Sequence, residues 1–350
     1  MKTRSFWKTP AGFVAFMFAL GFVLVACGTT AGVADRPYLA EMVVIGADGE
    51  WPLPGLLTLP LEATARNPVP AVVLVHGSGP SDLDSNVFGN RPFFDIANHL
   101  SANGVAVIRY DKRTYVHGEG MVRSLDGSLT AWEESVEDAI FAAELLRADP
   151  RIDENRVFLL GLSMGGMLAP NIHASGGNFA GLIVMAGTPR TLPELFLEQS
   201  RASIGLAMEA GPEKDMGLAQ LDMLEELFAA IPAMTPAEAQ AMDILGASAY
   251  YFKDLAARSF GNYIGEVSVP ILVMQGGRDF QVRADKDFVL LQELLEGRDN
   301  VTFKLYEDLN HVFVPTTATN FVEHAIGIMQ TPGRVDAQVL RDIVDWILAR

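Results

Sequence analysis

The strongest indication of this chain's fold is the segment RVFLLGLSMGG, residues 156–166. Its first half is a short apolar run, which predicts a strand buried inside a parallel sheet. Residues 167–169 continue in a pattern that a helix can adopt. Between them, Gly161 and Gly165 flank Ser163, and glycine is needed where a tight turn brings backbone close to its neighbours. The sequence therefore predicts a strand, a sharp turn that presents Ser163, and a helix directly behind the serine.

A pattern of the form G-x-S-x-G can arise by chance, so the rest of the chain must supply the partners that a reactive serine needs. A serine hydroxyl is a weak nucleophile until a base accepts its proton and an acid orients that base. On a strand–turn–helix of this kind, the acid and the histidine follow in chain order, at the carboxyl ends of later strands.

Two later strands are followed by residues of the required types. The apolar run 269–274 leads through Gly277 and Arg278 to Asp279, and the run 301–305 is followed by Asn310 and His311. Both positions follow from the strand pattern alone. We therefore predict Asp279 as the acid and His311 as the base of a Ser163-Asp279-His311 triad.

The other histidines fit this order less well. Four of them either precede the serine or fall on predicted helices, namely His76, His117, His99 and His173. His324 is the alternative base, in a segment whose pattern indicates helix or loop packing. Three further acids are interpreted as helix-start or loop charges, because only Asp279 directly closes a strand: Asp285, Asp287 and Asp308.

The oxyanion formed during acyl transfer needs two backbone N–H donors. One donor is expected from Met164, the residue after the serine. The other is expected from the loop His76-Gly77-Ser78-Gly79, which follows the buried apolar run 70–75. Ser78 is the first choice and Gly77 the second, and a plain tight turn is the alternative interpretation of this loop.

Predicted strands alternate with predicted helices along most of the chain, which indicates a mostly parallel, doubly wound α/β sheet. Two antiparallel strands are expected within residues 42–59, and the later strands at 70–75, 105–109, 156–160, 181–186, 269–274 and 301–305. Helices are expected near residues 94–100, 132–146, 284–295 and 335–348.

This alternation is interrupted between about residues 189 and 266, where the pattern is helical and no strand is expected. Thr235-Pro236-Ala237-Glu238 has the form of a capped helix start. We interpret the segment as an inserted helical cap over the site. Its methionines are expected to pack the cap, with one or two lining an acyl pocket: Met208, Met216, Met223, Met234 and Met242. Tyr250, Tyr251 and Phe252 are further pocket candidates, or cap-packing residues.

Composition limits the classes of partner. The 350 residues carry a formal net charge of -17, which argues against binding to nucleic acid and against adsorption to anionic lipid. The 49% hydrophobic content with 20% charged residues fits a globular core. Cys27 is the single cysteine, so no internal disulfide can form.

The N-terminal residues have the three-part layout of a secretory signal. Basic residues precede the apolar run 11–26, which is short for a membrane span of about 20 residues. Leu24-Val25-Ala26-Cys27 resembles the lipobox of bacterial lipoproteins. We therefore expect a signal peptide over 1–26, lipidation at Cys27, a tether over 27–40 and the main domain over 41–350. The alternative is an uncleaved N-terminal membrane anchor, and both interpretations predict an extracytoplasmic, membrane-anchored protein of the cell envelope.

Five motifs together resemble the α/β-hydrolase superfamily. They are HGSGP at 76–80, RYDKR at 109–113, GLSMGG at 161–166, GRD at 277–279 and NH at 310–311. The branch most similar to them comprises bacterial serine esterases related to dienelactone hydrolases and to the prolyl-oligopeptidase catalytic domain. The resemblance covers about residue 40 to the C-terminus and implies ester hydrolysis without a metal or organic cofactor. For the charges at Asp111-Lys112-Arg113, a loop-fixing ion pair is favoured over a substrate contact.

The sequence thus predicts a serine hydrolase, a carboxylesterase that cleaves small esters with short- to medium-chain acyl groups through an acyl-enzyme intermediate. A thioesterase or a peptidase would use the same triad, and a lyase or perhydrolase could use the same scaffold. A noncatalytic lipoprotein that binds a ligand is the alternative from another class, although the full set of serine, acid, histidine and oxyanion loop argues against it.

Overall fold

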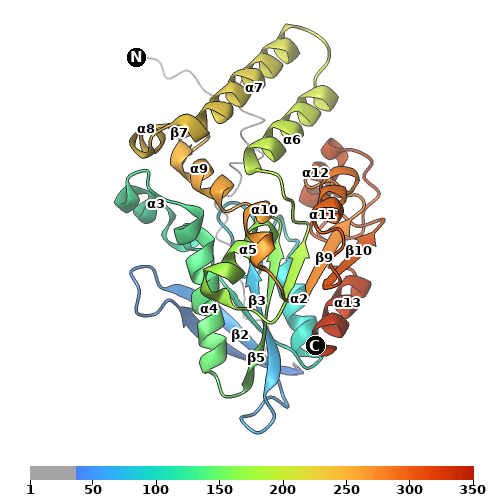
Figure 1. Cartoon of the computed structure of the whole chain (residues 1–350). Helices are drawn as coiled ribbons and strands as arrows, with labels where there is room; N and C mark the ends of the chain where they lie inside the picture. Colours follow the sequence, from blue (N-terminus) through green and yellow to red (C-terminus); the bar gives the residue numbers. More distant parts are fainter. Residues whose placement is uncertain (1–36) are drawn as a thin grey trace.

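The computed structural model describes residues 37–350, and the predicted signal peptide and Cys27 lie outside the described residues. Its centre is an eight-stranded sheet in the order β1-β2-β4-β3-β5-β6-β9-β10 (Figure 1). The strands are β1 (Tyr38–Ile45), β2 (Leu53–Pro60), β3 (Val69–Val75), β4 (Ala106–Tyr110), β5 (Ile152–Leu162), β6 (Leu182–Met185), β9 (Ile271–Gly276) and β10 (Val301–Tyr306). The pairs β1–β2 and β2–β4 are antiparallel and the others are parallel, so the predicted mostly parallel sheet is confirmed.

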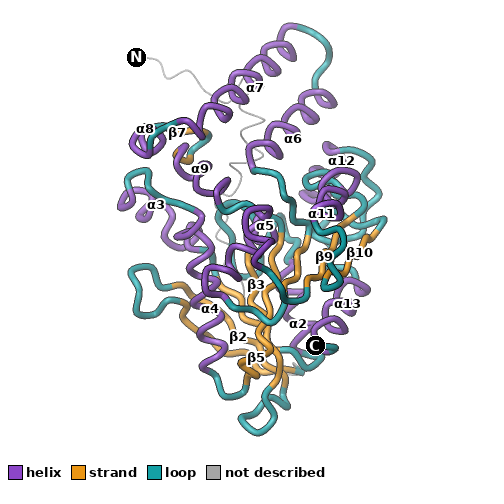
Figure 2. Tube along the Cα trace, in the orientation of Figure 1, coloured by secondary structure: helices purple, strands orange, loops and turns teal. Residues whose placement is uncertain are grey.

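The central strands are apolar on both faces because helices cover both sides of the sheet. All seven residues of β3 are buried. Its alternate residues point to opposite faces: Val73 and Val75 pack with helices α4 and α5, whereas Val72 and Leu74 pack with α2 and α13. Figure 2 shows these helices on the two sides of the sheet. The body helices are α2 (Pro92–Ser101), α3 (Arg113–Leu125), α4 (Glu137–Ala148), α5 (Met164–Ile172), α11 (Val289–Leu294), α12 (Phe321–Gln330) and α13 (Ala337–Leu348).

Two of the predicted helices begin with a π-helical turn, η2 (Trp132–Val136) before α4 and η6 (Ala284–Phe288) before α11. A third such turn, η3 (His173–Gly177), follows α5. Helix α3 is a helix that the sequence pattern did not predict. It contains Gly118 and Gly120, which are poor helix formers and hide its periodicity.

The segment between β6 and β9 is mainly helical, as predicted. It contains α6 (Leu192–Ala207), α7 (Pro212–Ala230), α8 (Pro236–Ala241), α9 (Ala249–Ala257) and α10 (Phe260–Tyr263), with the 3₁₀ turns η4 (Ile231–Ala233) and η5 (Ile264–Glu266). Figure 1 shows α6 and α7 as a hairpin beyond the end of the sheet. The predicted capping box at Thr235 and Glu238 is confirmed. We call residues 189–266 the cap.

One prediction about the cap is wrong, because it contains a two-stranded hairpin, β7 (Asp243–Ile244) and β8 (Ala247–Ser248). Leu245 and Gly246 connect these strands with positive φ angles of 57° and 87°, as a two-residue hairpin turn requires. Strands of two residues are too short to produce a visible alternation in the sequence.

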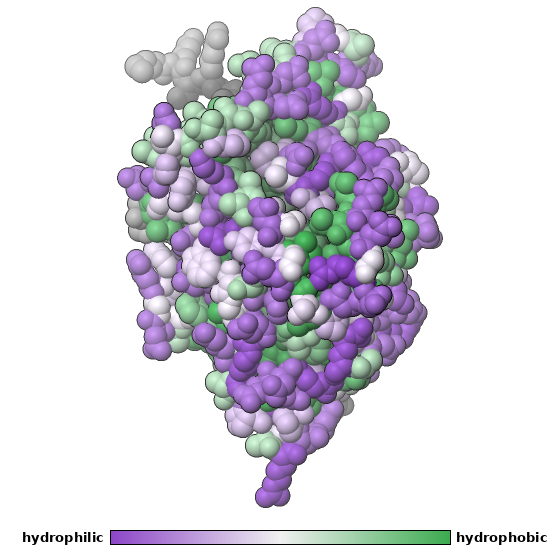
Figure 3. All heavy atoms as spheres, viewed as in Figure 1, coloured by the Kyte–Doolittle hydropathy of each residue, from purple (hydrophilic) through white to green (hydrophobic). Residues whose placement is uncertain are grey.

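The cap has its own apolar core, which includes Phe228, Ile231 and Ile244. Met208, Met234 and Met242 pack against this core, as expected. Met216 and Met223 do not, because they lie on the outer side of α7 with 50% and 71% exposure. The face of the molecule in Figure 3 is mostly hydrophilic, with apolar residues gathered where α11 and α12 lie. Within residues 37–350, no helix combines the length and apolar character that crossing a membrane requires.

Candidate active site

Ser163 lies on the turn between β5 and α5, as the sequence predicted. Its backbone has φ 57° and ψ -118°, a conformation that costs a non-glycine residue about 1–3 kcal/mol. Its N–H donates to Met185 O at 2.8 Å. A Cβ atom on Gly161 would lie 2.2 Å from Gly165 O, and one on Gly165 would lie 2.2 Å from Val75 O. Both glycines are therefore required by close backbone packing around the serine.

Asp279 and His311 meet directly. Asp279 follows β9 and His311 follows β10, and Asp279 Oδ2 lies 2.7 Å from His311 Nδ1. Asp279 is 2% exposed and His311 is 7% exposed. The predicted acid and the predicted base are thus a buried hydrogen-bonded pair.

Asp279 is held by further donors. Its Oδ1 accepts from the backbone N–H groups of Gln281 at 2.8 Å and Val282 at 3.0 Å. Burial by itself would raise the pKa of Asp279, but His311, the nearby His324 and the Val282 N–H outweigh burial and lower the pKa below its ordinary value. Gln275, which the sequence analysis did not single out, donates from Nε2 to Asp279 Oδ2 at 3.0 Å. Gln275 stands near the end of β9, just before the loop that carries Asp279, and this position in the sequence could have identified it.

The topology places the serine at the same edge of the sheet as this pair. Strands β5, β6, β9 and β10 are consecutive neighbours and run parallel, so their carboxyl ends lie together. Within the described part of the chain, no hydrogen bond joins Ser163 Oγ to His311. Catalytic hydrogen bonds often form fully only when substrate is bound, so the lack of this hydrogen bond is compatible with a triad.

The predicted oxyanion loop lies against the serine. A Cβ atom on Gly77 would be 3.2 Å from Ser163 Cβ and 3.7 Å from its Oγ. Met164 is the first residue of α5. Both predicted sources of oxyanion donors, the Gly77-Ser78 segment and Met164, therefore flank Ser163.

The expectation of a loop-fixing ion pair in the segment 111–113 is confirmed. Lys112 Nζ pairs with Glu134 Oε1 at 2.9 Å and also donates to Gly77 O at 2.9 Å. Asp111 Oδ1 accepts from Leu83 N at 2.7 Å, and the Arg113 guanidinium pairs with Asp138. Lys112 and Asp111 therefore hold loops in place, and Arg113 joins the start of α3 to α4.

Two of the other histidines, His324 and His76, are buried and contact other side chains. His324 lies on α12 with 2% exposure, and its Nε2 is 3.1 Å from Gln281 Nε2. Burial lowers the pKa of His324 to about 4, although Asp279 opposes that shift. Burial likewise lowers the pKa of His76 to about 3, and the His76 ring packs against Phe93. Neither ring contacts Asp279 as His311 does.

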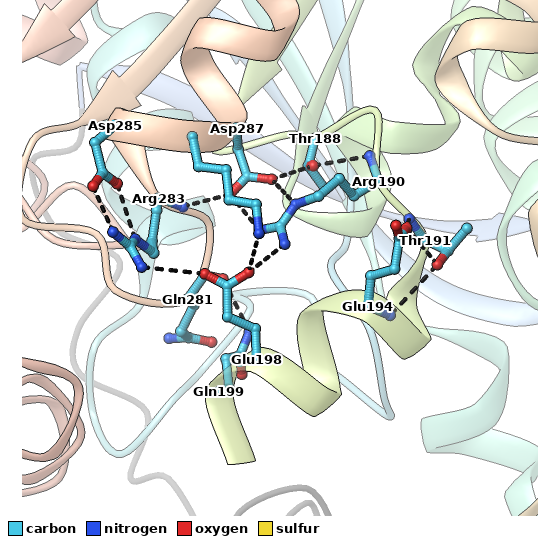
Figure 4. A network of polar contacts seen from close by, with 11 residues as sticks. Thr188, Arg190, Thr191, Glu194, Glu198, Gln199, Gln281, Arg283, Asp285 and Asp287 are labelled. Carbon is cyan, nitrogen blue, oxygen red and sulfur yellow. Dashed lines mark hydrogen bonds and ion pairs between the residues drawn. The ribbon is translucent and has the colours of Figure 1, made fainter. Parts of the chain in front are cut away.

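A network of ion pairs joins the start of the cap to the segment after Asp279 (Figure 4). At its centre Asp287, 0% exposed, accepts from Thr188 Oγ1 at 2.5 Å, from Arg190 Nε at 2.7 Å and from Arg283 N at 2.7 Å. Asp287 does lie in the first turn of η6, as its interpretation as a helix-start charge expects, but it is not a solvated charge, because Thr188 and Arg190 cover it. Asp285 and Asp308 do carry exposed charges, with side chains 67% and 75% exposed.

Cap helix α9 brings an aromatic side chain to the serine turn. The Tyr251 hydroxyl donates to Glu134 and lies 3.5 Å from Met164 Sδ. Tyr250 and Phe252 pack against the cap core. A role of these three residues in binding an acyl group stays a prediction. Among the described residues, no group of three or more His, Cys, Asp or Glu side chains could hold a metal ion.

Comparison with known proteins places this geometry in a family. The sequence profile of the alpha/beta hydrolase family matches residues 72–323. Esterase EstD of Thermotoga maritima is 35% identical over 297 residues, which cover 85% of this chain and 65% of that relative. The aligned part is therefore slightly less than two thirds of the relative's length.

Two solved structures share the fold at low identity. Est1E from Butyrivibrio proteoclasticus has a TM-score of 0.53 at 15% identity, covering 88% of this chain and 99% of its own. The acylaminoacyl peptidase of Pyrococcus horikoshii has a TM-score of 0.55 at 15% identity, covering 89% of this chain and 42% of its own. The predicted resemblance to the α/β-hydrolase superfamily is confirmed. This chain belongs to the alpha/beta hydrolase family.

Proposed function

We propose that this protein is a serine hydrolase that cleaves carboxylic esters with short- to medium-chain acyl groups. The observation that carries the proposal is the buried 2.7 Å hydrogen bond between Asp279 and His311, at the sheet edge where the turn presents Ser163. The relative EstD, named as an esterase, supports ester hydrolysis over other acyl transfers.

In the proposed mechanism, Ser163 Oγ attacks the ester carbonyl carbon while His311 Nε2 takes the hydroxyl proton. Asp279 keeps the proton of His311 on Nδ1 and stabilises the imidazolium that forms. The negative charge moves to the carbonyl oxygen, where the N–H groups of Met164 and Ser78 stabilise it. The C–O bond of the ester then breaks, and His311 gives its proton to the departing alcohol.

The acyl-enzyme is hydrolysed by the same groups in reverse roles. His311 removes a proton from water, the resulting hydroxide attacks the acyl carbon, and the ester bond to Ser163 breaks. The proton returns to Ser163 Oγ, and the carboxylic acid leaves. Every step uses side chains or backbone groups of this chain.

Labelling with a fluorophosphonate probe tests the nucleophile. The folded protein should form one adduct at Ser163, and Ser163→Ala should abolish it together with turnover of p-nitrophenyl butyrate. Ser268→Ala is the matched control, because Ser268 is exposed and lies outside the site. Labelling at another residue, or none in folded protein, would contradict the proposal.

A substrate panel tests the reaction class. A chain-length series of nitrophenyl esters, with a thioester and an aminoacyl amide beside it, should show fastest turnover of esters with short to medium acyl chains. Preference for the thioester or the amide would identify a thioesterase or a peptidase with the same triad.

The proposal extends to location, through the lipobox-like residues 24–27. The protein is exported, lipidated at Cys27 and held at a membrane of the cell envelope with its catalytic domain outside the cytoplasm. Its partners are then the membrane, through the lipid, and small ester substrates. Incorporation of labelled palmitate tests this, and incorporation that survives Cys27→Ser would contradict it.

A further inference from the structure

A buried cation lies behind the predicted oxyanion loop. The side chain of Lys112 is 2% exposed. Its ammonium group donates to Gly77 O at 2.9 Å and Gly79 O at 3.2 Å, and it pairs with Glu134 Oε1 at 2.9 Å. An ammonium group has three N–H donors, so this set of partners uses all of them. Lys112 therefore acts on the loop and has no donor left for substrate.

The contact with Gly77 O orients the next N–H group. The peptide between Gly77 and Ser78 is trans, since no cis peptide occurs among residues 37–350. In a planar trans peptide, the carbonyl oxygen and the following N–H point in opposite directions. With Gly77 O held by Lys112, the Ser78 N–H is directed away from Lys112. Since Gly77 packs against Ser163, this peptide lies beside the serine that the reacting carbonyl must approach.

Glu134 connects this lysine to a second element. It lies on the π-helical turn η2, with a side chain 6% exposed. One carboxylate oxygen pairs with Lys112, and the other accepts from the Tyr251 hydroxyl. Turns of π-helix within helices are frequent at functional sites. The carboxylate thus joins the β4–α3 junction to cap helix α9.

Tyr251 completes the connection to the serine turn. Its hydroxyl lies 3.5 Å from Met164 Sδ, and Met164 is the residue whose N–H is the other proposed oxyanion donor. Tyr251 is the cap residue in this set, whereas the remaining members belong to the body. This buried network therefore contacts the residues on both sides of the proposed oxyanion hole, Gly77 and Met164. Because Tyr251 belongs to the cap, the network depends on the position of the cap relative to the body.

We propose that Lys112, Glu134 and Tyr251 are positioning residues for the oxyanion hole, with Lys112 orienting the Ser78 N–H and Tyr251 linking the cap to Met164. This inference rests on the proposed function. The three residues act through the backbone donors and do not touch the substrate. Their removal should therefore weaken stabilisation of the tetrahedral state more than binding of the ester.

Tyr251→Phe is the mildest test, because it removes one hydroxyl and keeps the ring. We expect kcat for p-nitrophenyl butyrate to fall about tenfold with KM within about twofold, since oxyanion donors act in the transition state. Affinity for butylboronic acid, which forms a tetrahedral adduct on serine, should fall by a similar factor. Tyr38→Phe is the matched control, because the buried Tyr38 hydroxyl also donates to a side chain, that of Asn98, and Tyr38 lies on β1 at the far edge of the sheet.

Lys112 is tested in a double variant, because removing Lys112 by itself would leave the buried Glu134 carboxylate without a cation. The double variant Lys112→Met with Glu134→Gln should fold and lose about a hundredfold in kcat. Glu134→Gln by itself keeps an oxygen for only one of its two partners and leaves the Lys112 charge unpaired, so its kcat should also fall, by less than that of the double variant. Lys304→Met, at a half-exposed pair with Asp342, is the control and should leave kcat unchanged.

Circular dichroism and thermal unfolding first establish that each variant is folded. A folded double variant, or Tyr251→Phe, with wild-type kcat and wild-type boronic acid affinity would overturn the positioning role. Equal losses in kcat and in substrate binding would also overturn it, by showing a general disturbance of the site. Failure of the wild-type protein to react with fluorophosphonate is a separate outcome, which would overturn the proposed function as well.

Discussion

At the scale of single residues, the proposed chemistry depends most on Asp279. Its carboxylate accepts from His311 Nδ1 at 2.7 Å and from two backbone N–H groups. Burial opposes ionisation, but His311, His324 and the Val282 N–H outweigh burial and lower the pKa of Asp279. An ionised Asp279 keeps the His311 proton on Nδ1, which leaves Nε2 free to accept the proton of the serine.

The first prediction follows for Asp279→Asn. The amide can hold the ring in the wrong tautomer, so kcat for p-nitrophenyl butyrate should fall about 10⁴-fold. Asp308→Asn is the control on the neighbouring loop, since that side chain is 75% exposed, and it should leave kcat unchanged. A loss smaller than about tenfold in Asp279→Asn would show that another group orients the base.

The second prediction concerns pH and His324. Burial lowers the pKa of His324 from 6.5 to about 4, so the fold favours its neutral form. Its contribution to stability is complete above pH 6.5 and is lost as the pH falls toward 4, because there the unfolded chain binds a proton that the folded chain does not. Within that window the free energy of unfolding falls by about 1.4 kcal/mol per pH unit from this residue.

Urea unfolding at several pH values measures this slope. His324→Asn should reduce the pH dependence between pH 6.5 and 4 by the contribution of one proton, compared with wild type. His76, buried with a pKa of about 3, contributes in the same direction in both proteins and cancels in the comparison. Identical slopes for wild type and His324→Asn would contradict the assignment.

At the scale of elements, the β5–α5 turn allows a third prediction. A Cβ atom on Gly165 would lie 2.2 Å from Val75 O and 2.8 Å from His76 O, and both are backbone atoms that cannot move independently. Gly165→Ala should therefore lower the free energy of unfolding by about 4 kcal/mol or more. Gly205→Ala, in helix α6 with no atom within 4 Å of the new Cβ, should instead stabilise by about 0.5–1 kcal/mol. Urea midpoints compare the two, and similar destabilisation in both would disprove the packing argument.

The junction between the cap and the acid loop allows a fourth prediction. Asp287→Asn would leave Arg190 without its buried carboxylate, which should cost about 3–5 kcal/mol in unfolding free energy. Asp285→Asn removes an exposed partner of Arg283 and should cost about 0–1 kcal/mol. Equal effects in chemical denaturation would show that the Asp287 cluster is no stronger than a surface ion pair.

At the scale of the whole molecule, the first of the eight described strands of the sheet begins at Tyr38. The described residues contain all eight strands of the sheet and every proposed site residue other than Cys27. The fifth prediction is that a variant lacking residues 1–36 folds and keeps the kcat of the full chain. The full chain should fractionate with membranes and the shortened chain with the aqueous phase. Loss of activity in a folded shortened chain would contradict the prediction that residues 1–36 are needed only for membrane attachment.

Much of the fold could be predicted because its parts are local patterns. The parallel strands are continuous apolar runs, such as the seven buried residues of β3, and each run is readable without knowing its neighbours. The glycines around Ser163 mark a turn whose backbone permits no side chain. Helix α3 and the hairpin β7–β8 were missed, because glycines interrupt the first and the second is only two residues per strand.

The strands could be located from the sequence pattern, and with them the candidate positions Ser163, Asp279 and His311, since each follows a recognisable strand or turn. Which distant charges meet could not be predicted in this way, because it depends on the tertiary structure. Asp287 is buried by a contact with Thr188, which lies just before the cap. Lys112 is held behind Gly77 by its contacts with Gly77 O and with Glu134. Burial and pairing of a side chain depend on what covers it, and residues far away in the chain supply that cover.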